Sequence, residues 1–280
     1  MGRPPDFIGL GAQRSGTSWI YACLYEHPQI CAPTKEIHFF SREHNWRRGR
    51  PWYEQHFASC GPPTVAGEFS TSYLASPDAP ERIRGMYPAA KLLVSLRHPV
   101  ERLVSSYLND LSAGVVSAAT PLAEALQTRP DYVEQGHYAP QLERYLRRFP
   151  RSQMLVLIYD DAVRDPAGFI GQIYVFLGID PTFRPSMLTS RVGEGHVPRS
   201  VRFERALTHG GWVMRRGLTR RLWWVAKRAG VGRALRRANT ADRPRPALPP
   251  AERRRLVDAF ADDVTRLEHL LDRDLTAWRQ

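Results

Sequence analysis

The segment "FIGLGAQRSGTSWI" (residues 7–20) constrains the fold of this chain most strongly. An apolar run leads into two glycines and polar residues and then becomes apolar again, which predicts a buried strand over 6–12, a tight turn, and a helix from Ser15 to about His27. Gly11 and Gly16 have the G-x-x-x-x-G spacing of the Walker phosphate loop. That loop then requires a lysine, but Thr17 stands at its position, so the segment predicts an anion site rather than an ATPase.

The groups that would hold the anion come from one short stretch, because backbone N–H groups at a helix N-terminus face outward and favour negative charge. Hydroxyl side chains and a guanidinium add further donors, and the candidates are Arg14, Ser15, Gly16, Thr17 and Ser18. The alternative is that the two glycines only form a tight strand-to-helix turn.

A second anion site is predicted at the end of the apolar stretch "KLLVSLR" (91–97). Arg97 ends this strand, where α/β folds place ligands, and Ser105 follows on the second turn of a helix expected over 99–111. A guanidinium and a hydroxyl so placed can hold one phosphate between them. Taken alone the pair is weak evidence, since strand-end arginines often form ion pairs in solvent.

Strands alternate with helices along the first 180 residues, which predicts an α/β fold with a central, mainly parallel sheet and right-handed crossovers. Further strands are expected over 65–70 and 154–160, and helices over 80–87, 120–127, 138–149 and 166–177. The architecture is a P-loop-like three-layer sandwich with C-terminal helices, one of them over 251–278. We expect one domain over 1–280, with an α/β core over 1–200 and a basic helical extension over 201–280 packed on it.

The formal net charge of +12 is concentrated in one segment. Residues 202–237 contain eleven Lys and Arg and one acid, together with three tryptophans. We favour the interpretation that this segment forms a pair of helices packed on the sheet, with arginines on their outer face. The alternative interpretation is weak contact with an anionic membrane surface. No motif supports binding to nucleic acid.

Cysteine spacing and hydropathy give the expected compartment. Cys23, Cys31 and Cys60 show no paired spacing, so free thiols are expected rather than a disulfide or a zinc site. No apolar run approaches the ~20 residues that span a bilayer, and the N-terminus lacks a secretory signal. A cytoplasmic protein without a metal is therefore expected, and the preference for arginine over lysine suggests a GC-rich bacterium.

Four segments in order, "GAQRSGTSW", "KEIHFF", "GEFSTSY" and "LRHPVERLVSSY", resemble the signature segments of sulfotransferases that use 3′-phosphoadenosine 5′-phosphosulfate (PAPS), above all bacterial and heparan-sulfate members. The resemblance implies that residues 14–18 hold the 5′-phosphosulfate and that Arg97 and Ser105 hold the 3′-phosphate. A late glycine-rich loop adds Gly195, His196 and Arg199 as further, loosely aligned contributors.

On the acceptor side the resemblance implies Glu36 as the catalytic base. His38 would point to the same side if the segment is a strand, and would orient Glu36 or replace it as base, although a purely structural role competes. Glu68 is a second candidate carboxylate, in contact with substrate or with cationic neighbours. Arg14 stands where relatives carry lysine, so it can neutralise a leaving phosphate without giving it a proton. Phe69 replaces a lysine of the heparan-type pattern, which argues against heparan itself as acceptor.

An acceptor cleft lined by aromatic side chains is a further expectation, although each such residue is more often core. The candidates are Phe39, Phe40, Trp52, Tyr53, His137 and Tyr138.

The sequence thus favours a sulfotransferase that moves the sulfuryl group of PAPS to a hydroxyl of a carbohydrate, lipid-linked or secondary-metabolite acceptor by in-line displacement. The alternative is a P-loop kinase or NTPase, because "MLVLIYD" imitates a Walker B strand that ends in Asp160. A third hypothesis is a non-catalytic protein that binds nucleotide or membrane.

Overall fold

The computed structural model describes residues 2–62, 64–117, 119–189 and 248–280. These residues form two compact units, which are described one at a time. The first contains 2–102, 133–189 and 254–280, and the second contains 103–132 and 248–253. The organisation of 1–280 as one domain stays a prediction, and Gly195, His196, Arg199 and the basic segment 202–237 lie outside the described residues.

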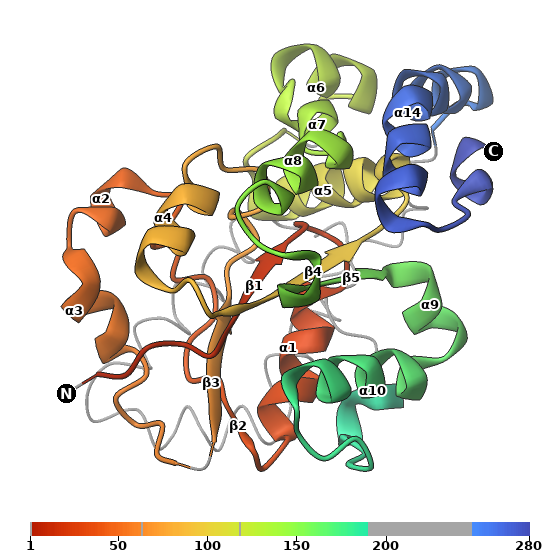
Figure 1. Cartoon of the computed structure of the whole chain (residues 1–280). Helices are drawn as coiled ribbons and strands as arrows, with labels where there is room; N and C mark the ends of the chain where they lie inside the picture. Colours follow the sequence, from red (N-terminus) through yellow and green to blue (C-terminus); the bar gives the residue numbers. More distant parts are fainter. Residues whose placement is uncertain (1, 63, 118, 190–247) are drawn as a thin grey trace, which may run out of the picture. The chain divides into compact units, whose positions relative to one another are not determined.

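The first unit is built on a five-stranded sheet in the order β2-β3-β1-β4-β5, in which every pairing is parallel (Figure 1). The strands are β1 (Phe7–Gly11), β2 (Ile30–Cys31), β3 (Val65–Phe69), β4 (Lys91–Leu96) and β5 (Met154–Ile158). The predicted fold class, a parallel sheet flanked by helices, is confirmed. Because β1 lies between β3 and β4, the loop that follows β1 leaves the sheet at the centre of its carboxyl edge.

One face of the sheet is covered by α1 (Thr17–Glu26) and α10 (Pro166–Leu177) (Figure 1). Side chains alternate between the two faces of a strand, so Phe7 of β1 and Leu93 of β4 share this face. They join a buried cluster that also includes Trp19, Ile20, Leu157, Phe169 and Ile173. Pro166 at the first helical position and Gly178, with φ 78°, mark the two ends of α10, which agrees with the predicted range.

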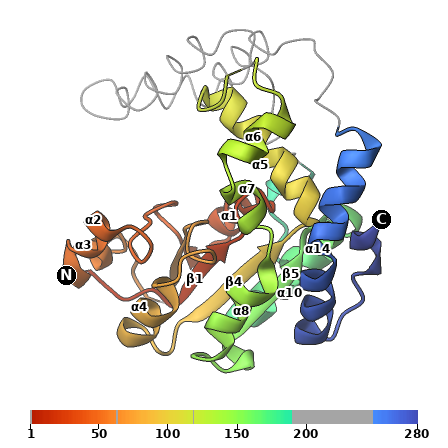
Figure 2. The same cartoon turned by 90° about the horizontal axis from the view of Figure 1, so that it is seen from above.

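The opposite face carries α4 (Ala79–Met86) and α8 (Tyr138–Leu146), with α14 (Pro250–Leu271) at the start of α8 (Figure 2). Asp263 of α14 is 6% exposed, and its carboxylate accepts the N–H groups of Tyr138 (2.8 Å) and Ala139 (3.1 Å). It thus satisfies N-terminal donors of α8 from a distant part of the chain. The amphipathic helix with a tail predicted over 251–278 corresponds to α14, which ends at Leu271, and to the residues after it.

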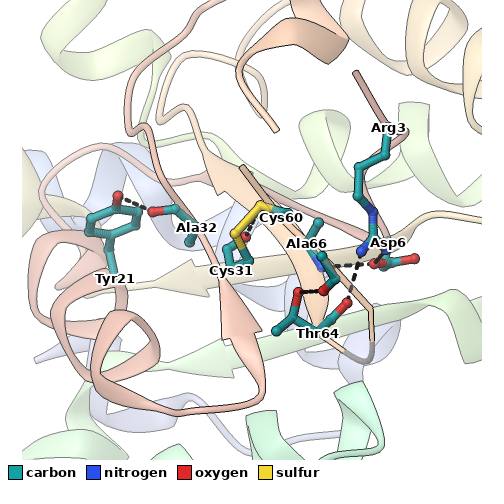
Figure 3. Close-up of a disulfide and its surroundings, with 9 residues drawn as sticks. Arg3, Asp6, Tyr21, Cys31, Ala32, Cys60, Thr64 and Ala66 are labelled. Atoms are coloured by element: carbon teal, nitrogen blue, oxygen red, sulfur yellow. Dashed lines mark hydrogen bonds and ion pairs between the residues drawn. A yellow bond between two sulfur atoms is a disulfide. The ribbon is translucent and has the colours of Figure 1, made fainter. Parts of the chain in front are cut away.

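The chain between β2 and β3 contains two helices that the sequence did not indicate, α2 (Glu43–Trp46) and α3 (Gly49–Gln55). Cys31 at the end of β2 forms a disulfide with Cys60, with Cα atoms 5.6 Å apart (Figure 3). The prediction of free thiols was therefore wrong for this pair. The bridge depends on the parallel pairing of β2 with β3, which brings distant residues together and leaves no trace in cysteine spacing. Cys23 is free and buried.

The second unit holds most of α5 (Pro99–Ala113), whose first turn belongs to the first unit, together with α6 (Leu122–Thr128) and the start of α7 (Asp131–Glu134). Asp110 organises it, because its carboxylate accepts the Tyr132 hydroxyl (2.7 Å) and pairs with Arg129 (3.2 Å). Among the described residues, no helix is long and apolar enough to cross a membrane.

Candidate active site

The loop after β1 presents the N-terminus of α1 at the carboxyl edge of the sheet. Gly16 precedes the helix with φ 78°, and a Cβ atom there would come within 2.5 Å of the Tyr159 ring, so a residue without a side chain is required. Ser15 and Thr17 are buried and Ser18 is exposed, while Arg14 and Gly16 are intermediate. The Ser15 carbonyl accepts the Ser95 hydroxyl of β4 (2.7 Å), which fixes the loop against the neighbouring strand.

Arg97 follows the last residue of β4, at the same edge of the sheet as this loop, because β1 and β4 are parallel neighbours. Its guanidinium lies 5.4 Å from the centroid of the Tyr159 ring, the same ring that faces Gly16. Tyr159, the first residue of α9 (Tyr159–Arg164), therefore joins the loop to Arg97, a role that sequence analysis missed. Ser105 lies on α5 in the second unit, so its pairing with Arg97 on one phosphate stays a prediction.

Glu36 is held by the end of β3 and the residues after it. Its backbone N–H donates to the Phe69 carbonyl (2.7 Å), and its carboxylate accepts the N–H of Thr71 (3.0 Å) and the Thr71 hydroxyl (3.1 Å). Glu36 and His38 both have positive φ, 59° and 54°, which is a strained conformation for side-chain-bearing residues. The segment is therefore an irregular loop, not the strand assumed in placing the two side chains together.

The side chains on both sides of Glu36 nevertheless converge on its carboxylate. His38 Nε2 lies 3.4 Å from Glu36 Oε2, and the Lys35 ammonium lies 3.2 Å from Glu36 Oε1. Lys35 also donates to the hydroxyl of Ser18 (3.0 Å), the exposed member of the predicted anion loop. The predicted base and the predicted anion loop are thus joined through one cation, Lys35, which the sequence analysis did not single out.

The surroundings of His38 favour the neutral form of its ring. Burial lowers the pKa of His38, and the positive charges of Arg42 and Lys35 lower it further, while Glu36 opposes the shift. Its Nδ1 lies 2.7 Å from the Ser72 hydroxyl, so the ring is held from both nitrogens. A neutral imidazole beside a partly buried carboxylate provides two groups able to accept a proton.

Glu68 is wholly buried, with 0% of its surface exposed, so the prediction that it contacts substrate is wrong. Its partners are hydroxyls of the protein core. Burial raises the pKa of its carboxyl to about 7, against hydrogen bonds that lower it.

The predicted acceptor cleft lined by aromatic side chains is also not supported by the structure. Four of its six predicted members are fully buried and belong to the core: Phe39, Phe40, Tyr53 and Tyr138. Trp52 and His137 are intermediate, and Trp52 is covered by the Arg48 guanidinium at 4.3 Å from its ring centroid.

The residues that come soon after His38 in the sequence line an open hollow of about 810 Å³. Its lining consists of Arg42, Glu43, His44 and Arg47. Three of these four side chains are basic, so this part of the surface favours negatively charged groups. Glu43 is occupied by ion pairs with Arg47 (3.0 Å) and Arg82 (2.8 Å).

Asp160, the residue that supported the Walker B alternative, lies on α9 rather than at the end of β5. Its carboxylate accepts the indole N–H of Trp278 (2.9 Å) and so holds the C-terminal 3₁₀ turn Thr276–Arg279. Its observed task is structural.

A parallel sheet with a glycine turn after its central strand, and with a carboxylate joined to that turn through Lys35, defines a P-loop-like protein without the Walker lysine. Within this class the chain belongs to the sulfotransferase domain family, whose model matches residues 4–193. The family predicted from the four sequence segments is thereby confirmed.

Relatives and solved structures agree with this assignment. The chain is 34% identical over 186 residues to heparan sulfate glucosamine 3-O-sulfotransferase 6 of Mus musculus, covering 63% of this chain and 53% of the relative. It is 32% identical over 182 residues to heparan sulfate glucosamine 3-O-sulfotransferase 3B1 of Homo sapiens, and this match covers 62% of this chain and 46% of the relative. It spans about half the length of these curated relatives. The crystal structure of a sulfotransferase from Alicyclobacillus acidocaldarius superposes with a TM-score of 0.73 and 26% identity, over 99% of this chain and all of that one.

Proposed function

We propose that this protein transfers the sulfuryl group of PAPS to a hydroxyl of an acceptor by in-line displacement. The observation that carries the proposal is the position of Lys35, whose ammonium contacts Ser18 of the loop (3.0 Å) and Glu36 (3.2 Å) at once. A group held on the loop is therefore next to a carboxylate, which is the arrangement that transfer from a bound anion to an incoming hydroxyl requires.

The donor is held from two sides in this proposal. The N–H groups that begin α1 and the Ser18 hydroxyl bind the 5′-phosphosulfate, and Arg14 and Lys35 neutralise the charge that develops on the leaving phosphate. Arg97 binds the 3′-phosphate, joined by Ser105 and by Gly195, His196 and Arg199 as the resemblance implies. Tyr159 keeps the loop and Arg97 at a fixed separation, because its ring contacts both.

Glu36 accepts the proton of the acceptor hydroxyl as the new O–S bond forms and the bond from sulfur to the phosphate oxygen breaks. Adenosine 3′,5′-bisphosphate leaves with the electron pair of that bond. His38 orients Glu36 through the 3.4 Å contact, and its neutral ring makes it the second candidate for the base.

For the acceptor, we infer a hydroxyl compound that carries negative charge of its own. The hollow lined by Arg42, His44 and Arg47 supports this inference, and so do the relatives, whose names give heparan sulfate glucosamine as their substrate. Phe69, which replaces the heparan-type lysine, is 1% exposed and buried against β1, so no cation is supplied from that position. A carbohydrate, lipid-linked or secondary-metabolite acid other than heparan fits these features.

The predicted cytoplasmic location is opposed by one observation. The Cys31–Cys60 disulfide is typical of oxidising compartments and rare in a reducing cytosol. Mass-spectrometric counting of free thiols in protein isolated from its native cell decides between the two, since one free thiol indicates an oxidising compartment and three indicate the cytosol. Bacterial origin and contact of 202–237 with a membrane stay predictions.

Donor binding is tested by thermal shift with adenosine 3′,5′-bisphosphate, AMP and Mg-ATP. The proposal expects stabilisation by the bisphosphate without magnesium, rising with concentration as RT ln(1 + [L]/Kd), and much less by AMP. Arg97→Ala should remove the preference for the bisphosphate, whereas Arg148→Ala, which breaks an exposed pair with Glu81, should keep it. A shift produced by Mg-ATP alone would support the kinase alternative instead.

Turnover is tested by transfer of ³⁵S from labelled PAPS to a panel of neutral and anionic hydroxyl compounds. Glu36→Gln should abolish transfer while leaving bisphosphate binding nearly intact, and Glu81→Gln, a change at an exposed carboxylate, should be active. A Glu36→Gln enzyme with normal turnover would move the base to His38. Equal turnover of neutral and anionic acceptors would contradict the inferred acceptor class.

A further inference from the structure

A buried carboxylate is connected to the backbone that carries the proposed base. Glu68 lies on β3 and is 0% exposed. Its Oε1 accepts the hydroxyls of Tyr73 (2.6 Å) and Tyr53 (3.2 Å), and its Oε2 accepts the hydroxyl of Ser70 (2.7 Å).

Two of these three hydroxyls also hold the segment that contains Glu36 and His38. Ser70 Oγ accepts the backbone N–H of His38 (2.9 Å), and the Tyr73 hydroxyl oxygen accepts the backbone N–H of Phe39 (2.9 Å). A hydroxyl has one proton, so an oxygen that accepts from the backbone on one side directs its own proton to the carboxylate on the other. Tyr53 differs, because its hydrogen bond to Glu68 does not continue to residue 38 or 39.

We propose that Glu68 is a positioning residue for the transfer reaction, which holds the backbone of His38 and Phe39 through the hydroxyls of Ser70 and Tyr73 and thereby fixes the pair Glu36–His38. The role in catalysis rests on the proposed function; the hold on the backbone does not. The positive φ values of Glu36 (59°) and His38 (54°) show why such a hold is needed, since a strained loop keeps its shape only where its surroundings determine it.

The ionised form of Glu68 is the one that fits this network. A proton on Oε2 would face the proton of Ser70, so one of the two hydroxyls would have to turn away and leave a buried partner unsatisfied. Burial raises the pKa of Glu68 to about 7, so both forms are populated near neutral pH. The other groups that face Glu68 are Tyr53 and Tyr73, whose pKa values burial raises, while Glu36 and Tyr21 interact with it through charge.

The hold on the backbone is measured by NMR on the full chain, labelled with ¹⁵N-histidine and ¹⁵N-phenylalanine. The amide resonances of His38 and Phe39, assigned with His38→Gln and Phe39→Leu, should shift with a midpoint near pH 7, following the pKa of about 7 of Glu68. Glu68→Gln should remove this midpoint, whereas Tyr53→Phe and Glu36→Gln should retain it. A wild-type protein without the midpoint, or a Glu68→Gln protein that keeps it, would overturn the proposal. Absence of the midpoint from the wild-type protein overturns the proposal even where a variant folds poorly.

The catalytic role is measured with an acceptor that the wild-type enzyme sulfates. Displacement of the base by a fraction of an ångström should lower kcat of Glu68→Gln about 10- to 100-fold, with bisphosphate affinity within about twofold of wild type. Ser70→Ala should behave alike, and the double variant should be no slower than either single one, because both break the same connection. Wild-type kcat in Glu68→Gln would refute the positioning role. A fully active Glu36→Gln enzyme would instead refute the base assignment and leave the NMR result standing.

Discussion

The Lys35 ammonium donates a hydrogen bond to Ser18 Oγ across 3.0 Å, although the two residues are 17 positions apart in the chain. The loop after β1 lacks its own lysine, because Thr17 stands there. Lys35 brings an ammonium to the same loop from the segment that follows β2, and its second contact, with Glu36 at 3.2 Å, joins the loop to the carboxylate.

Removal of this cation should therefore weaken both donor binding and turnover. Lys35→Ala is expected to raise the Kd for adenosine 3′,5′-bisphosphate by about 10-fold or more, because a charge-assisted hydrogen bond is lost. Isothermal titration measures the change. Lys35→Arg, which keeps the charge, should recover most of the affinity; equal affinities for Lys35→Ala and wild type would separate Lys35 from the donor.

Gly16 is a position where a methyl group cannot be accommodated. Its φ of 78° and the Tyr159 ring, 2.5 Å from a built Cβ, predict that Gly16→Ala costs about 1–3 kcal/mol of unfolding free energy and abolishes bisphosphate binding. The matched control is Gly85→Ala on α4, where a Cβ meets nothing within 4 Å and helix propensity favours alanine. Urea denaturation of both variants gives the comparison, and equal stabilities would contradict it.

The Cys31–Cys60 disulfide closes a loop with a sequence separation of 29. Constraint of the unfolded chain by such a loop contributes about 3–4 kcal/mol, so the variant Cys31→Ser/Cys60→Ser should lose about that amount. Reductant should lower Tm of the wild-type protein and leave the double variant unchanged, which provides an internal control. A wild-type Tm insensitive to reductant would show that the bridge contributes nothing to stability.

Stability should depend on pH through Glu68. Burial raises the pKa of its carboxyl to about 7, from the ordinary 4.5, so the folded state binds this proton more tightly than the unfolded state does. Its contribution is therefore fully present below about pH 4.5 and is lost as pH rises to about 7, by about 3 kcal/mol in total. Glu68→Gln should remove this slope from plots of unfolding free energy against pH. Retention of the slope in the variant would assign it to another group.

Asp263 should be essential for the attachment of α14 to α8. Asp263→Ala leaves the N–H groups of Tyr138 and Ala139 without their acceptor in a buried place, which is expected to cost about 1–3 kcal/mol. Asp262→Ala, a change at the exposed neighbour, should stay within about 0.5 kcal/mol of wild type. Thermal and urea unfolding measure both, and similar losses would show that helix propensity rather than the hydrogen bonds is responsible.

Much of the sheet could be predicted from the sequence, because its longer strands are apolar runs bounded by charged residues, glycine or proline. β4 and α10 lie within one residue of their expected ranges for this reason. β2 has only two residues, and α2 and α3 lie in a stretch rich in arginine and tryptophan without helical periodicity, so no local pattern indicated them.

The candidate site shows where sequence reasoning stops. Glu36 and His38 do lie together, as predicted. The reason is the positive φ of both residues in an irregular loop, and not the alternation of side chains along a strand. The buried carboxylate of Glu68 is satisfied by the hydroxyls of Tyr53, on α3, and Tyr73, after β3. The sequence spacing of these residues does not indicate that they meet. Contacts such as Lys35–Ser18 join separate elements, so they become visible only once the strand order is known.

The cross-link between Cys31 and Cys60 has a consequence for how such a protein diversifies. It ties down both ends of the excursion that carries Lys35, Glu36, His38 and the basic hollow, next to the paired strands β2 and β3. Lengthening a loop with fixed ends adds little entropic cost. Insertions at the junction of α2 and α3, residues 47–48, can therefore change the proposed acceptor side, while the proposed donor loop after β1, which lies outside the bridged segment, keeps its shape.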